Sequence, residues 1–231
     1  MSRLIAIGHD ALVAEWFRSP DWSSDAQRDF ETRLGRARLR SRPQYLRIKA
    51  LALVDAGRLD AAATLLRRVV DDYGDDWSQV TSAHEHLGDI CRSTGDLAGA
   101  ESEYRRVLML SPTLSCTSGE VHLKLGEVLL AAGVDDFAEI ERLIVAARPH
   151  SVFNKTAFRA NVLEARVAAA VGDVERRRAS ATAALSLVSA PSQFTRHPTV
   201  GLVDASPSLL AEVAAMVSDS VAPTRRWLRR T

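Results

Sequence analysis

The side chains in this sequence that could perform chemistry lie close together at His84, His86 and Cys91. On a helix, His84 and Cys91 share a face, where an imidazole and a thiolate could hold a metal ion or act as base and nucleophile. However, His122 follows His84 by 38 residues, an interval that recurs elsewhere in the chain. We therefore expect these side chains to pack in a helical array, with no catalytic residue, no metal site and no cofactor.

The other candidate sites carry weaker signals. Four acidic residues, Asp71, Asp72, Asp75 and Asp76, could ligate a hard cation, but their spacing is not that of an EF-hand loop, and we expect a solvated linker. His9, His150 and His197 have no partner at ligand spacing and are expected to be surface or capping residues. The chain has no glycine-rich phosphate loop, no GxSxG elbow and no HExxH motif. An enzyme is therefore the least favoured class.

Composition restricts the partners further. The 231 residues include 30 Lys plus Arg and 29 Asp plus Glu, a net charge of +1, so no global field favours nucleic acid or an anionic membrane. The cysteines are Cys91 and Cys116, too few for a disulfide scaffold or a four-cysteine zinc site. We expect a cytoplasmic protein without a secretory signal or membrane span. The preference for Arg over Lys suggests a bacterial source with a GC-rich genome.

An internal repeat positions all of these residues. Gly57, Gly95, Gly133 and Gly172 follow one another at intervals of 38, 38 and 39, each between two stretches with helical spacing of apolar residues. Ala62, Ala100 and Ala138 keep the same two intervals of 38. Glycine provides the left-handed conformation that ends a helix, and Asp96 or Asp173 can cap the next one. Each copy is therefore predicted to be a helical hairpin, in which small residues allow close approach of two helices.

In the second copy a Leu87-Gly88 pair is followed by the turn glycine Gly95 and by Ala100, Tyr104 and Pro112. These residues occupy signature positions of the tetratricopeptide repeat family, which this copy resembles. The third copy keeps Leu125-Gly126, Gly133 and Ala138 but has Arg142 at the aromatic position, where the first copy has Leu66. The family repeat has about 34 residues, and four more are about one helical turn. The resemblance implies an all-α, right-handed solenoid with diverged capping helices at both ends.

The chain divides accordingly into four parts. Residues 1–42 form an N-terminal capping hairpin with an apolar stripe of Ile5, Leu12, Val13, Trp16 and Phe17, followed by Phe30 and Leu34. Residues 43–185 carry the repeats, at about 43–80, 81–118, 119–157 and 158–187. A connector and a capping helix (Ser206 to Ser218) occupy 188–221, and a basic tail occupies 222–231.

The first helices of such hairpins line a groove, where the resemblance places a binding surface. Counting from the glycine turns, its exposed positions are predicted to be Arg47, Leu51, Glu85, Asp89, Arg92, Leu123, Glu127, Leu130, Val162 and Arg166. Relatives that hold a C-terminal carboxylate use Lys and Asn there, so the acids argue against that ligand. The favoured function is a non-enzymatic scaffold or adaptor for a protein or peptide. The alternatives are a solvated face, a regulatory peptide-sensing or nucleic-acid-associated module, and an enzyme; a homo-oligomer is also compatible.

The tail contains Arg225, Arg226, Arg229 and Arg230 around Trp227 and Leu228. Three interpretations remain open: a solvated end, a weak contact with nucleic acid, and docking onto the acidic positions Glu85, Asp89 and Glu127. Docking would make the tail a competitor for the groove.

Overall fold

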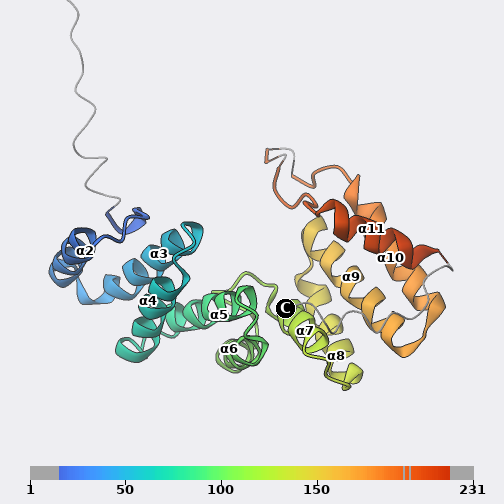
Figure 1. Ribbon diagram of the computed structural model, residues 1–231, viewed down its shortest axis with the longest axis horizontal. Coiled ribbons are helices and arrows are strands. Elements are labelled where there is room, and N and C mark those ends of the chain that lie inside the picture. The colour runs from blue at the N-terminus through green and yellow to red at the C-terminus, as the bar shows by residue number, and fades with distance from the viewer. Residues whose placement is uncertain (1–15, 195, 198, 219–231) are drawn as a thin grey trace, which may run out of the picture. The chain divides into compact units, whose positions relative to one another are not determined.

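The chain folds into successive α-helices, as the computed structural model shows for residues 16–218 except 195 and 198 (Figure 1). The helices are α2 (Ser24–Arg36), α3 (Arg42–Asp55), α4 (Leu59–Asp72), α5 (Trp77–Ser93), α6 (Leu97–Leu110), α7 (Val121–Ala131), α8 (Phe137–Ala147), α9 (Asn154–Val171), α10 (Val174–Val188) and α11 (Pro207–Val217). Three short 3-10 helices are η1 (Trp16–Arg18), η2 (Leu39–Ser41) and η3 (Arg148–His150). No strand occurs in this part of the chain, so the all-α prediction is confirmed.

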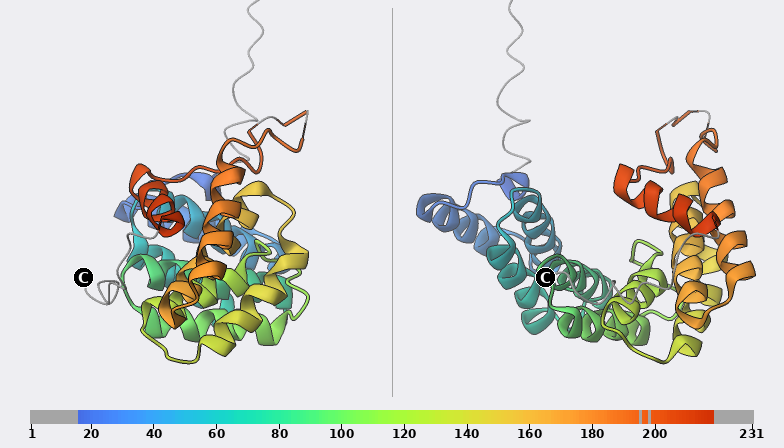
Figure 2. Two further views of the ribbon diagram at one scale, coloured as in Figure 1. Left: turned by 90° about the vertical axis from the view of Figure 1, so that its right-hand side faces the viewer. Right: turned by 45° about the vertical axis from the view of Figure 1, so that its right-hand side comes forward.

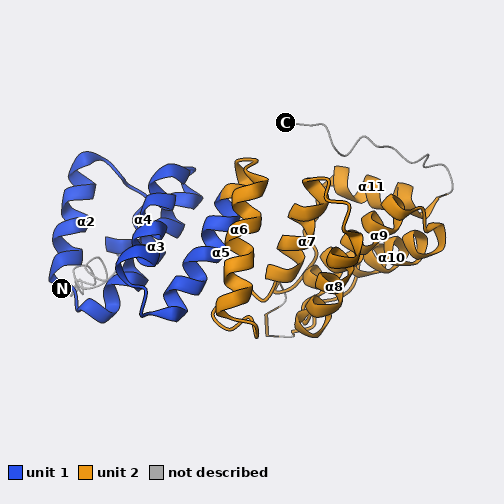
Figure 3. Cartoon of the chain, turned by 90° about the horizontal axis from the view of Figure 1, so that it is seen from below, with its two compact units in different colours: residues 1–90 blue, residues 91–231 orange. Residues whose placement is uncertain are grey.

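The chain forms two compact units, residues 1–90 and 91–231 (Figure 3). The division falls near the end of α5, whose start at Trp77 lies one helical turn before the predicted repeat boundary at 81. Likewise α9 starts at Asn154 rather than at 158. The glycine interval fixes the turns between helices but not where each helix begins.

Glycines end the first helix of each hairpin, as predicted. Gly57, Gly95, Gly133 and Gly172 have φ values of 72°, 82°, 74° and 79°, the left-handed region that favours glycine. The second helices α6 and α10 begin with the expected caps, since the Asp96 carboxylate accepts from the Gly99 N–H and that of Asp173 from the Arg176 N–H.

The third hairpin departs from the predicted register. Its cap is Asp136, which accepts from the Glu139 N–H, so its turn is two residues longer than the turn from Gly95 to Asp96. Fourth and eighth after the cap come Ile140 and Ile144, both buried, where α6 has Ala100 and Tyr104. The placement of Ala138 and Arg142 at these positions was therefore wrong, and both are exposed.

Close approach in this hairpin depends on glycine in α7 instead. A Cβ added at Gly126 would lie 2.8 Å from Leu163 Cδ2 and 3.5 Å from Ile140 Cγ2. The larger Ile140 is accommodated because its neighbour has no side chain. These residues belong to the main core of the second unit, to which Tyr104, Leu125 and Leu163 contribute.

The fourth hairpin ends against α11 rather than another repeat. In α10 the fourth residue after the cap Asp173 is Arg177, a buried arginine whose Nε donates to the Met216 carbonyl at 3.0 Å. Val213 and Met216 of α11 pack with Phe158 and Ala181 in a separate apolar cluster. Figure 2 shows α11 beside α9 and α10. The predicted helix from Ser206 to Ser218 is thus present, and its packing supports the capping role.

The first unit has its own core, with Phe30 and Leu34 of α2 packed against α3 and α4. Lys49 is buried there; its ammonium donates to the carbonyls of Ser19 and Asp21 at 2.5 and 2.9 Å and lies 5.2 Å from the centre of the Trp22 ring. Burial lowers the pKa of Lys49, opposed by the Asp21 carboxylate. Ile5, Leu12 and Val13 lie outside the described residues, so the predicted N-terminal hairpin stays a prediction.

The revised register makes a paired prediction. Ala100→Leu should lower the free energy of unfolding by about 1–3 kcal/mol, because Ala100 is fully buried between helices. Ala138→Leu should change it by less than about 0.5 kcal/mol, because residue 138 is exposed. Urea unfolding measures both values. Equal losses would contradict the two-residue insertion.

Candidate functional site

The predicted groove positions of the first unit are partly occupied or buried. The Arg47 Nε donates to Gln79 Oε1 at 2.7 Å, and Leu51 and Asp89 are half-buried. Glu85, predicted to be exposed, is only 2% exposed. The buried positions of α5 include 80, 81, 83, 85, 87, 88 and 90, which cannot fall on one stripe. An inner helix is covered on several sides, so counting from the turn overstated its free surface.

Four predicted positions in the second unit line one pocket: Arg92, Glu127, Val162 and Arg166. Two others do not, since Leu123 is fully buried in the core and Leu130 packs against that core. The prediction of exposure was wrong for Leu123 and also for Val162, which is buried although it forms part of the pocket wall. α7 is buried nearly all round, like α5.

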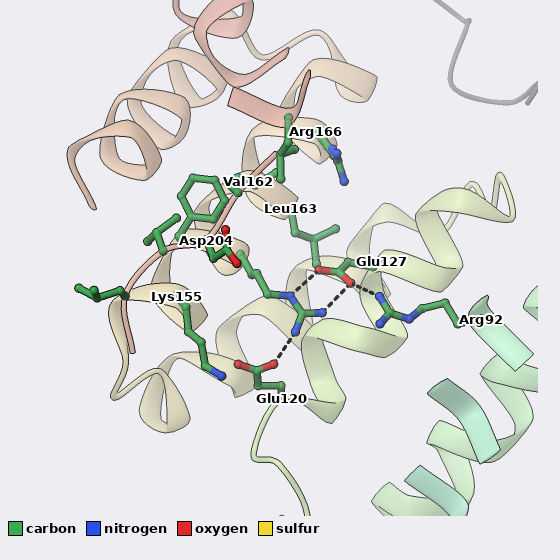
Figure 4. A pocket seen from close by; sticks show the side chains of 14 residues that line it. Arg92, Glu120, Glu127, Lys155, Val162, Leu163, Arg166 and Asp204 are labelled. Carbon is green, nitrogen blue, oxygen red and sulfur yellow. Dashed lines mark hydrogen bonds and ion pairs between the residues drawn. The ribbon is translucent and has the colours of Figure 1, made fainter. Parts of the chain in front are cut away.

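The pocket has a volume of about 470 Å³. Its walls come from α7, α9, the end of α5, the start of α11 and the connector that precedes α11. Phe158, Val162, Leu163, Leu202 and Leu209 provide apolar surface, and the polar lining consists of Arg92, Glu120, Glu127, Lys155, Arg159, Arg166 and Asp204 (Figure 4). An apolar wall with a few directed polar groups is typical of a recognition site.

A forked arginine organises the polar side of this pocket. Arg159 of α9 donates from Nε and Nη2 to the two carboxylate oxygens of Glu127, at 3.1 and 2.7 Å, and from Nη1 to Glu120. Glu120 also accepts from the Thr156 hydroxyl at 2.7 Å, and Glu127 accepts from Arg92 Nη1 at 3.2 Å. We call these five residues the Arg159 network.

Electrostatics favours the charged form of Arg159. Burial by itself would lower the pKa of its guanidinium, but the carboxylates of Glu127 and Glu120 outweigh burial and hold that pKa above its ordinary value. Arg159 and Glu120 are mostly shielded from solvent, so their attraction is screened less than that of a surface pair. The network therefore fixes α7 and α9 to each other at the pocket.

The connector covers the other predicted groove positions of α9. Arg166 makes two hydrogen bonds to Glu212 of α11, at 2.7 and 3.1 Å. Val203 and Ala205 of the connector pack against the cluster that contains Phe158 and Val162. The wall is thus shared between a repeat and a non-repeat segment, which explains why Val162 is buried.

Sequence reasoning missed Arg159, Lys155 and the connector residues 202–205. Arg159 lies one helical turn before Val162, on the same face of α9, and opposite the acid at Glu127 this spacing could have indicated an interhelical pair. The connector carries no helical period, so nothing in its pattern points to the groove.

Among the described side chains, no three His, Cys, Asp or Glu residues lie close enough together to hold a metal ion. Cys91 packs against the main core of the second unit, and His84 is half-buried. In the acidic run, Asp76 accepts from Ser78 Oγ at 2.8 Å and from the Gln79 N–H at 3.2 Å, at the start of α5. This carboxylate is therefore a helix cap.

The basic tail, residues 222–231, lies outside the described residues. Two of the three acids expected to attract it are unsuited to that contact, because Glu85 is buried and Glu127 already holds Arg92 and Arg159.

His122 of α7 stacks on His150 of η3, with ring centroids 6.3 Å apart and an angle of 22° between the planes. Its Nδ1 is buried without a hydrogen-bond partner in the described part of the chain. Burial, and then the neighbouring His150, lower the pKa of His122 below its ordinary value of 6.5. The folded state therefore favours the neutral ring.

The His122 environment predicts acid sensitivity. As pH falls below 6.5, the unfolded chain gains a proton at His122 before the folded chain does, so the free energy of unfolding should decrease. The slope from this group is at most about 1.4 kcal/mol per pH unit. Urea unfolding at several pH values should give a flatter profile for His122→Leu. The control His197→Leu, at an exposed histidine, should leave the slope unchanged.

The Arg159 network predicts that removing a shielded arginine costs much more unfolding free energy than removing a solvent-exposed one. Arg159→Met should lower the free energy of unfolding by about 2–4 kcal/mol, because it leaves the shielded carboxylate of Glu120 without a cation and that of Glu127 with Arg92 alone. Arg28→Met, which removes a solvent-exposed pair with Asp25, should cost less than about 0.5 kcal/mol. Chemical denaturation measures both. Similar small losses would mean that the network contributes little to α7–α9 packing.

Comparison with known proteins agrees with the geometry. The tetratricopeptide repeat family model matches residues 23–76 and 47–114, which include α2 to α6. No curated protein matches the chain. None of the described helices combines the length and apolar character needed to cross a bilayer. Helical hairpins with glycine turns continue beyond the matched region, through α10. On these grounds residues 23–114 of the chain consist of tetratricopeptide repeats.

Proposed function

We propose that this protein is a non-enzymatic scaffold or adaptor that binds a segment of a partner protein in the pocket between α7, α9 and the connector. Tetratricopeptide repeats generally mediate protein interactions, which supports the class of function. The observation that carries the proposal is the pocket itself, about 470 Å³ with an apolar wall beside directed charges.

The residues proposed to contact the partner differ from those expected first. Leu202 and Leu209 take the anchoring role expected of Leu123 and Leu130, since both line the pocket. Arg92 and Arg166 keep their proposed role in setting the register of the bound segment through charge. In the first unit, Arg47, Leu51 and Asp89 remain proposed contacts with a partner protein.

The Arg159 network supports tight recognition because it holds the wall before a partner arrives. A site whose side chains are already ordered loses less conformational entropy on binding. The four basic and three acidic residues of the lining nearly balance. This balance favours a peptide over a nucleic acid, whose backbone requires a basic stripe.

A site-specific photo-crosslinker tests this function. Placed at Leu202, which is 38% exposed in the pocket, it should capture a partner in extracts of the native host. The matched control is Met109 on α6, 72% exposed and outside the pocket lining, where the same partner should not be captured.

A second substitution makes the result specific. Leu209→Glu, combined with the crosslinker at Leu202, should abolish capture, and circular dichroism and the melting temperature establish that this variant is folded. Capture that is equal at Leu202 and Met109, or that survives Leu209→Glu, would contradict the assignment of the pocket.

A further inference from the structure

The polar groups of the pocket fall into two sets, those already bonded and those with free capacity. Both carboxylate oxygens of Glu120 and of Glu127 accept hydrogen bonds within the Arg159 network. All three kinds of guanidinium nitrogen of Arg159 donate to these acids. Arg159, Glu120 and Glu127 therefore direct their polar atoms at one another and leave few hydrogen-bonding positions for a ligand.

Free donors remain at Lys155 and Arg92. The Lys155 ammonium has no oxygen acceptor in the described part of the chain. Its Nζ lies over the Phe153 ring, 6.0 Å from the ring centroid. Arg92 donates from Nη1 to Glu127 at 3.2 Å, and 40% of its side chain is exposed. Figure 4 shows Lys155 on the side of Glu120 and Arg92 on the side of Glu127. The corresponding free acceptor is the single carboxylate of Asp204.

The main chain at Lys155 is fixed, which keeps its side chain at the pocket edge. Its N–H donates to the Gly201 carbonyl at 2.9 Å, so α9 is tied to the connector at this point. A Cβ added at Gly201 would lie 2.8 Å from Phe153 Cδ1, so the approach leaves no room for a larger residue. The connector and the first turn of α9 are thus locally one wall.

The connector itself demonstrates what this wall accepts. Exposure alternates along residues 202–205, with Val203 and Ala205 half-buried against the cluster that contains Phe158 and Val162. Leu202 and Asp204, the alternate side chains, are exposed at the pocket. A chain that alternates aliphatic residues with an acid therefore already lies on one side of the cavity.

We propose that the pocket selects an extended segment of a partner protein in which an acidic side chain is flanked by aliphatic residues. The acid pairs with Lys155, and the aliphatic residues contact Leu202, Leu209 and the wall at Val162. This inference rests on the proposed function, because it specifies the chemistry of the segment bound there. The acid is an internal side chain, so the ligand needs no free carboxyl terminus.

Synthetic peptides blocked at both ends test the preference. Three fluorescein-labelled probes carry a central Leu-Val-Glu-Ala-Leu motif, the same motif with Gln in place of Glu, and the same motif with Lys. Fluorescence anisotropy with the full chain should show that the Glu probe binds about three- to tenfold more tightly than the Gln probe at low salt. This advantage should shrink at about 0.5 M salt, where exposed pairs are screened.

Variants of the chain assign the preference to its residues. Lys155→Gln should reduce the advantage of the Glu probe to less than about twofold, whereas Lys155→Arg should retain it. The matched control Arg106→Gln removes one positive charge from an exposed position on α6 and should leave the preference unchanged. Melting temperatures establish that each variant is folded.

The outcomes separate this inference from the function on which it rests. Equal binding of the three probes, or tighter binding of the Lys probe, would overturn the acidic preference and leave a peptide-binding pocket. A preference that survives Lys155→Gln would overturn the assignment to this site. Failure of every probe to bind would count against both proposals.

Discussion

The contact between Arg159 and the carboxylates of Glu120 and Glu127 fixes how α7 and α9 pack, and the pocket of the second unit depends on it. It joins α7 to α9 across neighbouring hairpins, at a place where solvent is largely excluded. A planar guanidinium can bond both oxygens of one acid in a fixed geometry and still donate to a second acid. Because Arg159 donates to both acids, Lys155 keeps its donors for other contacts. Local packing and the proposed recognition thus depend on the same three side chains.

Much of the architecture could be predicted from the sequence, because helix ends leave local signals. The turns at Gly95 and Gly172 and the caps Asp96 and Asp173 were each expected, since both residue types act on their own backbone neighbourhood. The third hairpin shows the limit of this reasoning. Its glycine keeps the expected interval, but a longer turn to Asp136 moves Ile140 and Ile144 to the buried positions. Interval alone does not encode turn length.

The candidate site was less accessible to prediction, for a reason that lies in the packing. Helical phase identifies one face per helix, but α5 and α7 are buried on several faces, so Glu85 and Leu123 are not available at the surface. The connector contributes Leu202 and Asp204 without any periodic pattern. Arg92, Glu127 and Arg166 do line the pocket, because the helix faces that carry them remain partly exposed. The connector reaches α9 only in the tertiary structure, so no pattern among neighbouring residues in the sequence predicts that contact.

The buried Arg177 has a consequence for how the array ends. Stacks of helical repeats present an apolar face at each extremity, and such a face can add another repeat or a second molecule without limit. At this extremity α11 covers the last hairpin, and the Arg177 guanidinium binds the Met216 carbonyl near the end of α11. A repeat or a second molecule in the place of α11 would cover the Arg177 guanidinium again, and without an acceptor for it this burial would be costly. The Arg177 side chain therefore makes addition of a further repeat at this face unfavourable.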